Sequence, residues 1–174
     1  MPDLRSAITD QDHIQGDHEA PLTLLEYGDF QCPHCLLAHK IVKRLTTHFG
    51  PRLRFVYRNF PLIEIHPMAE PAAEAAEFAA AADPAKYWPM HDAIFAHQSR
   101  LSLKLLAAEA GKLALDPSEA LVAIEEHRFA KRIQRDFETG EEAGVHGTPT
   151  FFINGKQHEG SWEYDELLQA LEDS

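Results

Sequence analysis

The sequence contains little cysteine, few basic residues relative to acidic ones, and no long apolar run. Only two of its 174 residues are cysteine, whereas small domains that depend on disulfides generally use several bridges to compensate for a thin core. Sixteen basic residues against 28 acidic ones give a formal net charge of -12, which repels nucleic acids and anionic lipid surfaces. We therefore expect neither a disulfide scaffold nor a nucleic-acid or membrane partner.

Extended apolar segments are missing as well. No segment approaches 18 uninterrupted apolar residues, and residues 1–21 lack the apolar stretch behind a basic start that marks a secretory leader. We therefore expect a cytoplasmic protein, or a periplasmic one if a leader has been removed.

The composition that remains is typical of a globular domain, with 44% apolar and 25% charged residues. Residues 22–27 are apolar on both alternating faces, which predicts a buried central strand. Residues 33–49 show helical spacing of apolar side chains, and residues 53–60 are rich in aromatic and β-branched residues. This order of strand, helix and strand predicts a right-handed parallel crossover.

The rest of the chain changes character twice. An alanine-, glutamate- and leucine-rich block predicts four or five helices, and Asn154-Gly155 then indicates a hairpin turn between two short strands. Trp162 and three later leucines predict a closing helix. We accordingly expect an N-terminal extension (1–20), a first α/β half (21–66), an all-helical insertion (67–144) and a second half (145–174).

Both cysteines lie in the tetrapeptide Cys32-Pro33-His34-Cys35. Proline is favoured at the first helical position, which places Cys32 at or beside the N-cap, where unpaired backbone N–H groups point. These groups and the helix dipole stabilise a thiolate, and a protonated His34 would lower the pKa of Cys32 further. Cys32 is therefore predicted to be the attacking, solvent-facing thiol.

Cys35 follows one helical turn later on the same side, within reach of a disulfide after modest adjustment. Stabilising the Cys32 thiolate stabilises the reduced pair, which makes the disulfide a better oxidant. Glu26 shares a strand face with Leu22 and Leu24, so its carboxylate is expected either to lie under the helix and exchange a proton with Cys35, or to reach solvent at the strand end.

The cysteine pair has a second interpretation, because two thiolates at this spacing are also half of a zinc site. Eleven histidines could supply further ligands, but no second Cys/His pair has the spacing of a zinc finger. The motif also opens a helix directly after a buried strand. These features favour redox chemistry without a bound metal.

Two segments together resemble the DsbA-type branch of the thioredoxin superfamily, namely "LLEYGDFQCPHC" and "GVHGTPTFFINGK". The resemblance extends from about Asp12 to the closing helix. It implies an α/β thioredoxin-like fold, with β-α-β and β-β-α halves around a helical subdomain, and a protein-disulfide oxidoreductase that needs no cofactor. The implied partners are protein or peptide thiols and disulfides, with glutathione or a thioredoxin-type system for recycling.

The same resemblance assigns roles to residues far from the cysteines. It implies a cis peptide bond between Thr148 and Pro149, packed against the disulfide, and a Thr148 backbone that pairs with an extended substrate peptide. Glu26 matches the buried acid of the family. Relatives of this branch also include kappa-type glutathione transferases and isomerases, which usually lack the second cysteine that Cys35 supplies here.

Overall fold

This computed structural model describes residues 3–174. Its β-strands form one sheet. Residues 1–2 of the expected N-terminal extension lie outside the described residues. Five strands stand in the order β1-β3-β2-β4-β5. β2 and β3 are parallel, and the other neighbours are antiparallel. The strands are β1 (His13–Gln15), β2 (Leu22–Gly28), β3 (Leu53–Asn59), β4 (Thr150–Ile153) and β5 (Lys156–Gln157).

Seven α-helices are found in the described chain, and five of them occupy the block for which four or five were predicted. The closing helix begins at Tyr164, so Trp162 lies before it, contrary to our expectation. Glu163 has an extended backbone and is the N-cap, which sets the helix start two residues beyond Trp162. The helices are α1 (Pro33–Phe49), α2 (Ala69–Ala82), α3 (Tyr87–Ala96), α4 (Leu103–Lys112), α5 (Pro117–Glu125), α6 (Ala130–Glu142) and α7 (Tyr164–Glu172).

The described chain divides into two compact units. The sheet unit comprises residues 3–28, 37–60 and 136–174, and the helical unit comprises residues 29–36 and 61–135. These limits differ from the boundaries expected at residues 66 and 144, because the segment with both cysteines groups with the helical unit and because α6 continues across residue 135.

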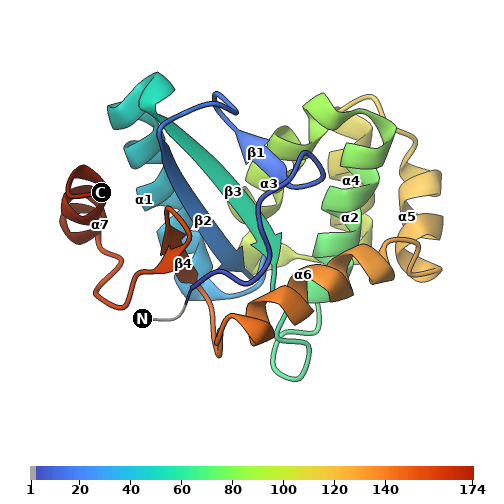
Figure 1. The fold of residues 1–174 in the computed structure, drawn as a ribbon. Helices are drawn as coiled ribbons and strands as arrows, with labels where there is room; N and C mark the ends of the chain where they lie inside the picture. Colours follow the sequence, from blue (N-terminus) through green and yellow to red (C-terminus); the bar gives the residue numbers. More distant parts are fainter. Residues whose placement is uncertain (1–2) are drawn as a thin grey trace. The chain divides into compact units, whose positions relative to one another are not determined.

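Within the sheet unit, β2 is the central strand that its apolar pattern predicts. It pairs with β3 on one side and β4 on the other, and its last six residues are buried. Gly28 ends the strand where a Cβ atom would lie only 2.5 Å from the ring of Tyr57, so a larger residue would require this buried ring to move. α7 lies beside α1 (Figure 1), with the Arg44 guanidinium carbon 3.7 Å from the centre of the Tyr164 ring.

The N-terminal extension contributes a strand that the sequence analysis did not predict. β1 pairs antiparallel with β3, and Asp12 just before it holds Arg58 of β3 through two hydrogen bonds of 2.8 and 3.0 Å. Such bidentate pairs are among the stronger side-chain contacts. A three-residue strand is too short to show a period in the sequence, which is why β1 escaped notice.

The helical unit packs closely around α2. Its alanines Ala72, Ala75, Ala76 and Ala79 are all fully buried, and small side chains allow helices to approach one another. α2 contacts α3, α4 and α5, and α4 also contacts α5 (Figure 1). The alanine-rich segment thus forms the centre of this unit.

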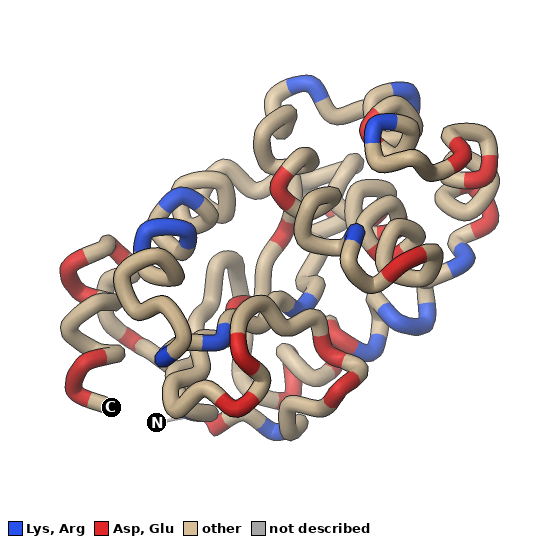
Figure 2. The backbone as a smooth tube through the Cα atoms, turned by 90° about the horizontal axis from the view of Figure 1, so that it is seen from above, with Lys and Arg blue, Asp and Glu red and all other residues tan. Residues whose placement is uncertain are grey.

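Acidic residues outnumber basic ones, but they do not form one continuous block along the chain. Figure 2 shows acidic and basic positions interspersed along the chain, with 28 Asp and Glu against 16 Lys and Arg. Among residues 3–174, no helix combines the length and the apolar character needed to cross a membrane.

One acidic side chain, Glu74 of α2, is fully buried within the helical unit. Burial raises the pKa of its carboxyl group from 4.5 to about 7; the Phe129 N–H bond lowers this pKa and neighbouring Glu70 raises it. Glu74 is protonated in the folded chain over a pH range in which it would ionise in the unfolded chain. The resulting contribution to stability is fully present below pH 4.5 and is lost as the pH rises through 7.

We expect Glu74→Gln to make the protein less sensitive to alkaline pH. The free energy of unfolding of the variant minus that of the parent chain should be roughly 3 kcal/mol larger at pH 8 than at pH 5, because glutamine carries no charge to bury. Urea unfolding at both pH values measures this difference. Glu77→Gln is the matched control, since Glu77 is buried beside Arg132, with 3.8 Å between Oε1 and Nε, and should bring no such gain. Parallel pH profiles for Glu74→Gln and the parent would contradict the assignment.

Candidate active site

The cysteine pair lies at the start of α1, in the helical unit. Pro33 is the first residue of the helix, so Cys32 occupies the N-cap position that the sequence predicted. The Cys32 carbonyl accepts hydrogen bonds from the N–H groups of Cys35 at 3.0 Å and Leu36 at 3.3 Å. No disulfide joins the two cysteines in this structure. The backbone therefore places Cys32 where N–H groups without helical partners converge.

The accessibility of Cys32 differs from our expectation of a solvent-facing thiol. Its exposed fraction is 4%, against 0% for Cys35, whereas Pro33 and His34 between them are exposed. The Gln98 side chain covers the adjacent backbone by donating hydrogen bonds to the carbonyls of Phe30 at 2.9 Å and Cys32 at 2.7 Å. Cys32 is thus only slightly more exposed than Cys35, and both are buried.

Asp29 organises the turn that leads into the helix. Its Oδ1 atom accepts hydrogen bonds from the N–H groups of Gln31 at 2.7 Å and Cys32 at 3.2 Å. Its Oδ2 atom accepts a bond from the Leu62 N–H at 2.9 Å and lies 2.7 Å from Nδ1 of His66. With 1% of its surface exposed, this carboxylate depends on these donors for the solvation that water would otherwise supply.

The backbone of Asp29 also contacts the second cysteine directly. Its N–H group donates a hydrogen bond to Sγ of Cys35 over 3.4 Å. A hydrogen bond to an ionised acceptor is stronger than one to a neutral acceptor, so this donor favours the thiolate form of Cys35. Asp29 therefore contacts both halves of the motif, the Cys32 backbone through its carboxylate and the Cys35 sulfur through its amide.

A third polar contact adds to the hydrogen bonds of the Asp29 carboxylate, which we call the Asp29 clamp. The Gln31 side-chain oxygen accepts a hydrogen bond from the Met68 N–H at 2.7 Å. Like the Asp29 bonds, it ties the turn before α1 to the loop between β3 and α2. The turn that leads to Cys32 is consequently fixed by two of its own side chains, those of Asp29 and Gln31.

Sequence reasoning missed four of these residues: Asp29, Gln31, His66 and Gln98. One signal was available, because an aspartate three residues before an N-cap is typical of a turn in which its side chain accepts backbone N–H groups. His66 and Gln98 lie more than 30 residues away along the chain, and no local pattern connects them to the motif.

Three other predicted site residues belong to the sheet unit. Glu26 of β2 pairs with Phe151 of β4 and is 2% exposed, which excludes the alternative of a carboxylate reaching solvent at the strand end. The peptide bond between Thr148 and Pro149 is cis, as the resemblance implies. The structure thus places Glu26 on β2, Thr148-Pro149 directly before the neighbouring strand β4, and the cysteine motif in the other unit.

A hollow of about 330 Å³ lies beside this proline in the sheet unit. Its lining includes Pro149, Phe151, His158 and Trp162. The His158 ring is held by a 2.7 Å contact between Nε2 and the Ser161 carbonyl. The hollow joins aromatic and polar surface, which suits the side chain of an extended peptide.

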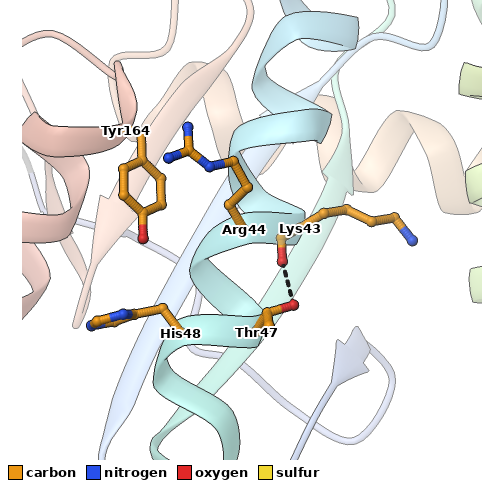
Figure 3. Close-up of a pocket in the computed structure, with 5 residues that line it drawn as sticks. All are labelled: Lys43, Arg44, Thr47, His48 and Tyr164. Carbon is orange, nitrogen blue, oxygen red and sulfur yellow. Dashed lines mark hydrogen bonds between the residues drawn. The ribbon is translucent and has the colours of Figure 1, made fainter.

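A larger hollow of about 480 Å³ lies between α1 and α7 (Figure 3). Lys43, Arg44, Thr47, His48 and Tyr164 line it, and the Thr47 hydroxyl donates to the Lys43 carbonyl at 3.0 Å. All of these residues except Tyr164 of α7 come from the second half of α1, about 12 Å or more along the helix from the cysteine motif at 1.5 Å per residue. We do not assign the redox site to this hollow.

Comparison with known proteins agrees with this geometry. The family model described as thioredoxin matches residues 8–173. The chain belongs to this thioredoxin family. Its five-stranded mixed sheet with flanking helices is the thioredoxin-like fold that the sequence predicted.

Two solved structures show how far the fold of this thioredoxin-family chain is shared. Oxidised BdbD from Bacillus subtilis has a TM-score of 0.85 and 23% identity, covering 93% of this chain and 91% of that one. A thioredoxin-like oxidoreductase from Silicibacter pomeroyi DSS-3 has a TM-score of 0.77 and 25% identity, covering 95% and 92%. The fold, helical insertion included, is therefore common to these proteins.

A curated relative is much longer than this thioredoxin-family chain. The protein named Na(+)/H(+) antiporter NhaA 1 from Salinispora arenicola (strain CNS-205) is 43% identical over 162 residues. The match covers 93% of this chain but only 24% of that protein. The chain thus spans about a quarter of the length of the curated relatives that it matches.

The Asp29 clamp predicts a measurable effect on both stability and thiol accessibility. Asp29→Ala should lower the free energy of unfolding by roughly 3 kcal/mol, because the Gln31 N–H, the Leu62 N–H and the His66 ring lose their acceptor, whereas the Cys32 N–H keeps the Asp29 carbonyl. Cys35 should also be alkylated faster by iodoacetamide, since the turn that covers it loosens. Urea unfolding and mass spectrometry of the alkylated chain measure the two effects.

Asp116→Ala is the matched control for this prediction. Asp116 is an exposed N-cap of α5 and accepts hydrogen bonds from the N–H groups of Ser118 and Glu119. Its loss should cost about 1 kcal/mol and leave cysteine alkylation unchanged. Asp29→Asn, which retains one acceptor oxygen, should fall between the two. Equal behaviour of Asp29→Ala and Asp116→Ala would show that Asp29 is an ordinary cap.

Proposed function

We propose that this chain is a thiol–disulfide oxidoreductase that exchanges disulfides with protein or peptide clients through Cys32 and Cys35. The observation that supports this most strongly is the N-terminal placement of both cysteines on α1, with the Asp29 N–H directed at the Cys35 sulfur. The thioredoxin family and its fold agree with this assignment.

The first step forms a mixed disulfide. The Cys32 thiolate attacks one sulfur of a client disulfide, a new S–S bond forms, and the other client sulfur leaves as a thiolate. N–H groups at the start of α1 stabilise the negative charge on Cys32 before attack. In the opposite direction, a client thiolate attacks Cys32 of the oxidised pair, so the same geometry serves oxidation and reduction.

The second step releases the client. The Cys35 thiolate attacks Sγ of Cys32, the bond between Cys32 and the client breaks, and the client leaves as a thiolate while Cys32 and Cys35 form a disulfide. Cys35 loses its thiol proton before this attack, and the hydrogen bond from the Asp29 N–H stabilises the thiolate that results. We assign the transfer of its proton to the buried carboxyl group of Glu26, the role that the family resemblance implies.

Client binding is assigned to the cis-proline segment. The Thr148 backbone would pair with an extended client, as in β-strand addition. The hollow beside Pro149 that contains Trp162 would then accept a neighbouring client side chain. Thioredoxin-type or glutathione-dependent recycling completes the cycle.

Two other functions remain as outcomes of the tests below. A kappa-type glutathione transferase would keep turnover without Cys35, and a metal-binding module would hold zinc with both thiolates and show no disulfide exchange. The curated relatives are named as antiporters, but we propose thiol chemistry for this chain, because the supporting geometry centres on Cys32 and Cys35.

Protein clients are favoured over small disulfides by apolar surface close to the motif. Ile63 and Ile65, in the loop between β3 and α2, are 64% and 68% exposed. The same loop holds the Asp29 clamp through the Leu62 N–H and His66. Exposed isoleucines on a loop fixed to the redox site suit unfolded chains, which present apolar side chains.

Cysteine variants distinguish the proposed function from its alternatives. Cys32→Ser should abolish reduction of insulin by dithiothreitol above background, because the attacking sulfur is gone. Cys35→Ser should accumulate a mixed disulfide between Cys32 and the client, visible on a non-reducing gel, because the resolving sulfur is gone. Insulin reduction that survives Cys32→Ser would contradict the mechanism, and glutathione transfer that survives Cys35→Ser would favour a transferase.

The apolar loop should matter for proteins alone. We expect Ile63→Ser with Ile65→Ser to slow insulin reduction roughly 3- to 10-fold, because apolar contact with the client is lost. Reduction of oxidised glutathione should change less than twofold. Val122→Ser is the control, since Val122 is 38% exposed on α5 in the same unit. Equal losses with both substrates would show that the loop shapes the site rather than binding clients.

A further inference from the structure

A second cluster of ligand-type side chains lies in the helical unit. Glu70 and Glu74 stand one turn apart on α2, and His127 follows the end of α5. One ligand atom from each of the three residues lies within 4.8 Å of the others. The His127 Nδ1 atom is 3.3 Å from the Glu70 Oε1 atom. None of the three belongs to the proposed redox site.

The local structure explains why these residues meet. Residues four apart on a helix project from the same face, which brings the two carboxyl groups together. His127 has a φ of 50°, and the backbone after it bonds back to α5 through Arg128 N–H and the Ala123 carbonyl. The next residue, Phe129, donates its N–H to Oε2 of Glu74 at 2.8 Å. This turn is thus anchored directly beside α2.

Glu74 supplies the observation that points to a ligand. The residue has no exposed surface, and its Oε1 atom accepts no hydrogen bond from any group in residues 3–174. A buried carboxylate oxygen without a donor is costly, and a second carboxylate nearby adds repulsion. Either a cation or a proton shared with Glu70 would remove this cost.

We infer that Glu70, Glu74 and His127 form a site for a divalent transition-metal ion of the Zn²⁺ class. Two carboxylate oxygens and one imidazole nitrogen are a donor set that such ions accept, with water at the fourth position. Tetrahedral zinc with bonds near 2.1 Å separates its ligand atoms by roughly 3.4 Å, close to the 3.3 Å between Glu70 and His127. The 64% exposed His127 side chain gives the ion access from solvent.

The imidazole determines which ion is expected. A site of carboxylates alone would suit Ca²⁺ or Mg²⁺, which prefer oxygen ligands in larger number. Nitrogen coordination favours Zn²⁺ and its transition-metal neighbours. Bound metal would connect α2 to the turn after α5, so the expected consequence is a more stable helical unit, independent of the redox reaction.

Zinc titration of a chain without thiols tests the site. Cys32→Ser with Cys35→Ser removes the only cysteines of the sequence, so zinc at the redox motif does not contribute. Isothermal titration calorimetry with Zn²⁺ should give one ion per chain, and thermal unfolding should shift upward with added Zn²⁺. Bound Co²⁺ should produce the visible absorption bands that are typical of a Co²⁺ ion with a low coordination number. Ca²⁺ should show no comparable binding.

Variants on the cysteine-free background locate the ion. Glu74→Gln should weaken Zn²⁺ binding at least about tenfold, since even indirect partners of a metal ligand have effects of that size. His127→Asn should do the same while tolerating the positive φ. The control is His97→Ala, because the His97 ring is 3.7 Å from Glu109, which already pairs with Lys112 at 2.8 Å, and it should change binding less than twofold.

Two results would overturn the inference. Absence of saturable Zn²⁺ binding to the cysteine-free chain would mean that Glu70 and Glu74 only share a proton. Binding that persists unchanged in both Glu74→Gln and His127→Asn would place the ion elsewhere. Circular dichroism of each variant confirms that it is folded, and agreement of two variants on different elements excludes a folding defect as the cause.

Discussion

The buried carboxylate of Asp29 is the interaction on which the cysteine site depends. A charged group with 1% exposure is stable only where donors surround it. Three backbone N–H groups and the His66 ring provide them, and each donor comes from the turn before α1 or from the loop before α2. The same group therefore orders the backbone of Cys32, sets the start of the helix and fixes the loop that exposes Ile63 and Ile65. The reactivity of the two sulfurs depends on this fixed backbone, because the N–H groups beside them stabilise a thiolate only if they stay in place.

Regular elements were predictable where a repeating pattern spans enough residues. The central strand β2 and helix α1 are confirmed with almost their predicted limits, because a strand of seven residues that is apolar on both faces and a helix of seventeen residues with regular apolar spacing leave little choice. β1 was missed because three residues show no period, and α7 starts later than expected because Glu163 takes an extended backbone.

The site was predictable only in its local part. The N-cap position of Cys32 follows from Pro33, and the cis bond at Pro149 followed from the family resemblance alone. His66 and Gln98 act on the motif across 31 and 63 residues measured from Cys35, and contacts of that range arise from tertiary packing, which no single-sequence pattern encodes. The low exposure of Cys32 was unpredictable for the same reason, since Gln98 bonds to the neighbouring backbone from a helical turn that is distant in the sequence.

The fully buried alanines of α2 restrict how this protein can vary. Ala72, Ala75, Ala76 and Ala79 have no exposed surface, so a larger side chain at any of them must be accommodated inside the helical unit. Overpacking of a buried site costs about 1–3 kcal/mol. The alanine-rich composition of α2 suggests a segment that accepts many substitutions. These four buried positions should nevertheless tolerate substitution less well than the charged surface positions around them. Engineered variants of the helical unit with a changed binding specificity should therefore carry their substitutions in its loops and exposed helix faces. The four buried alanines of α2 should be left unchanged.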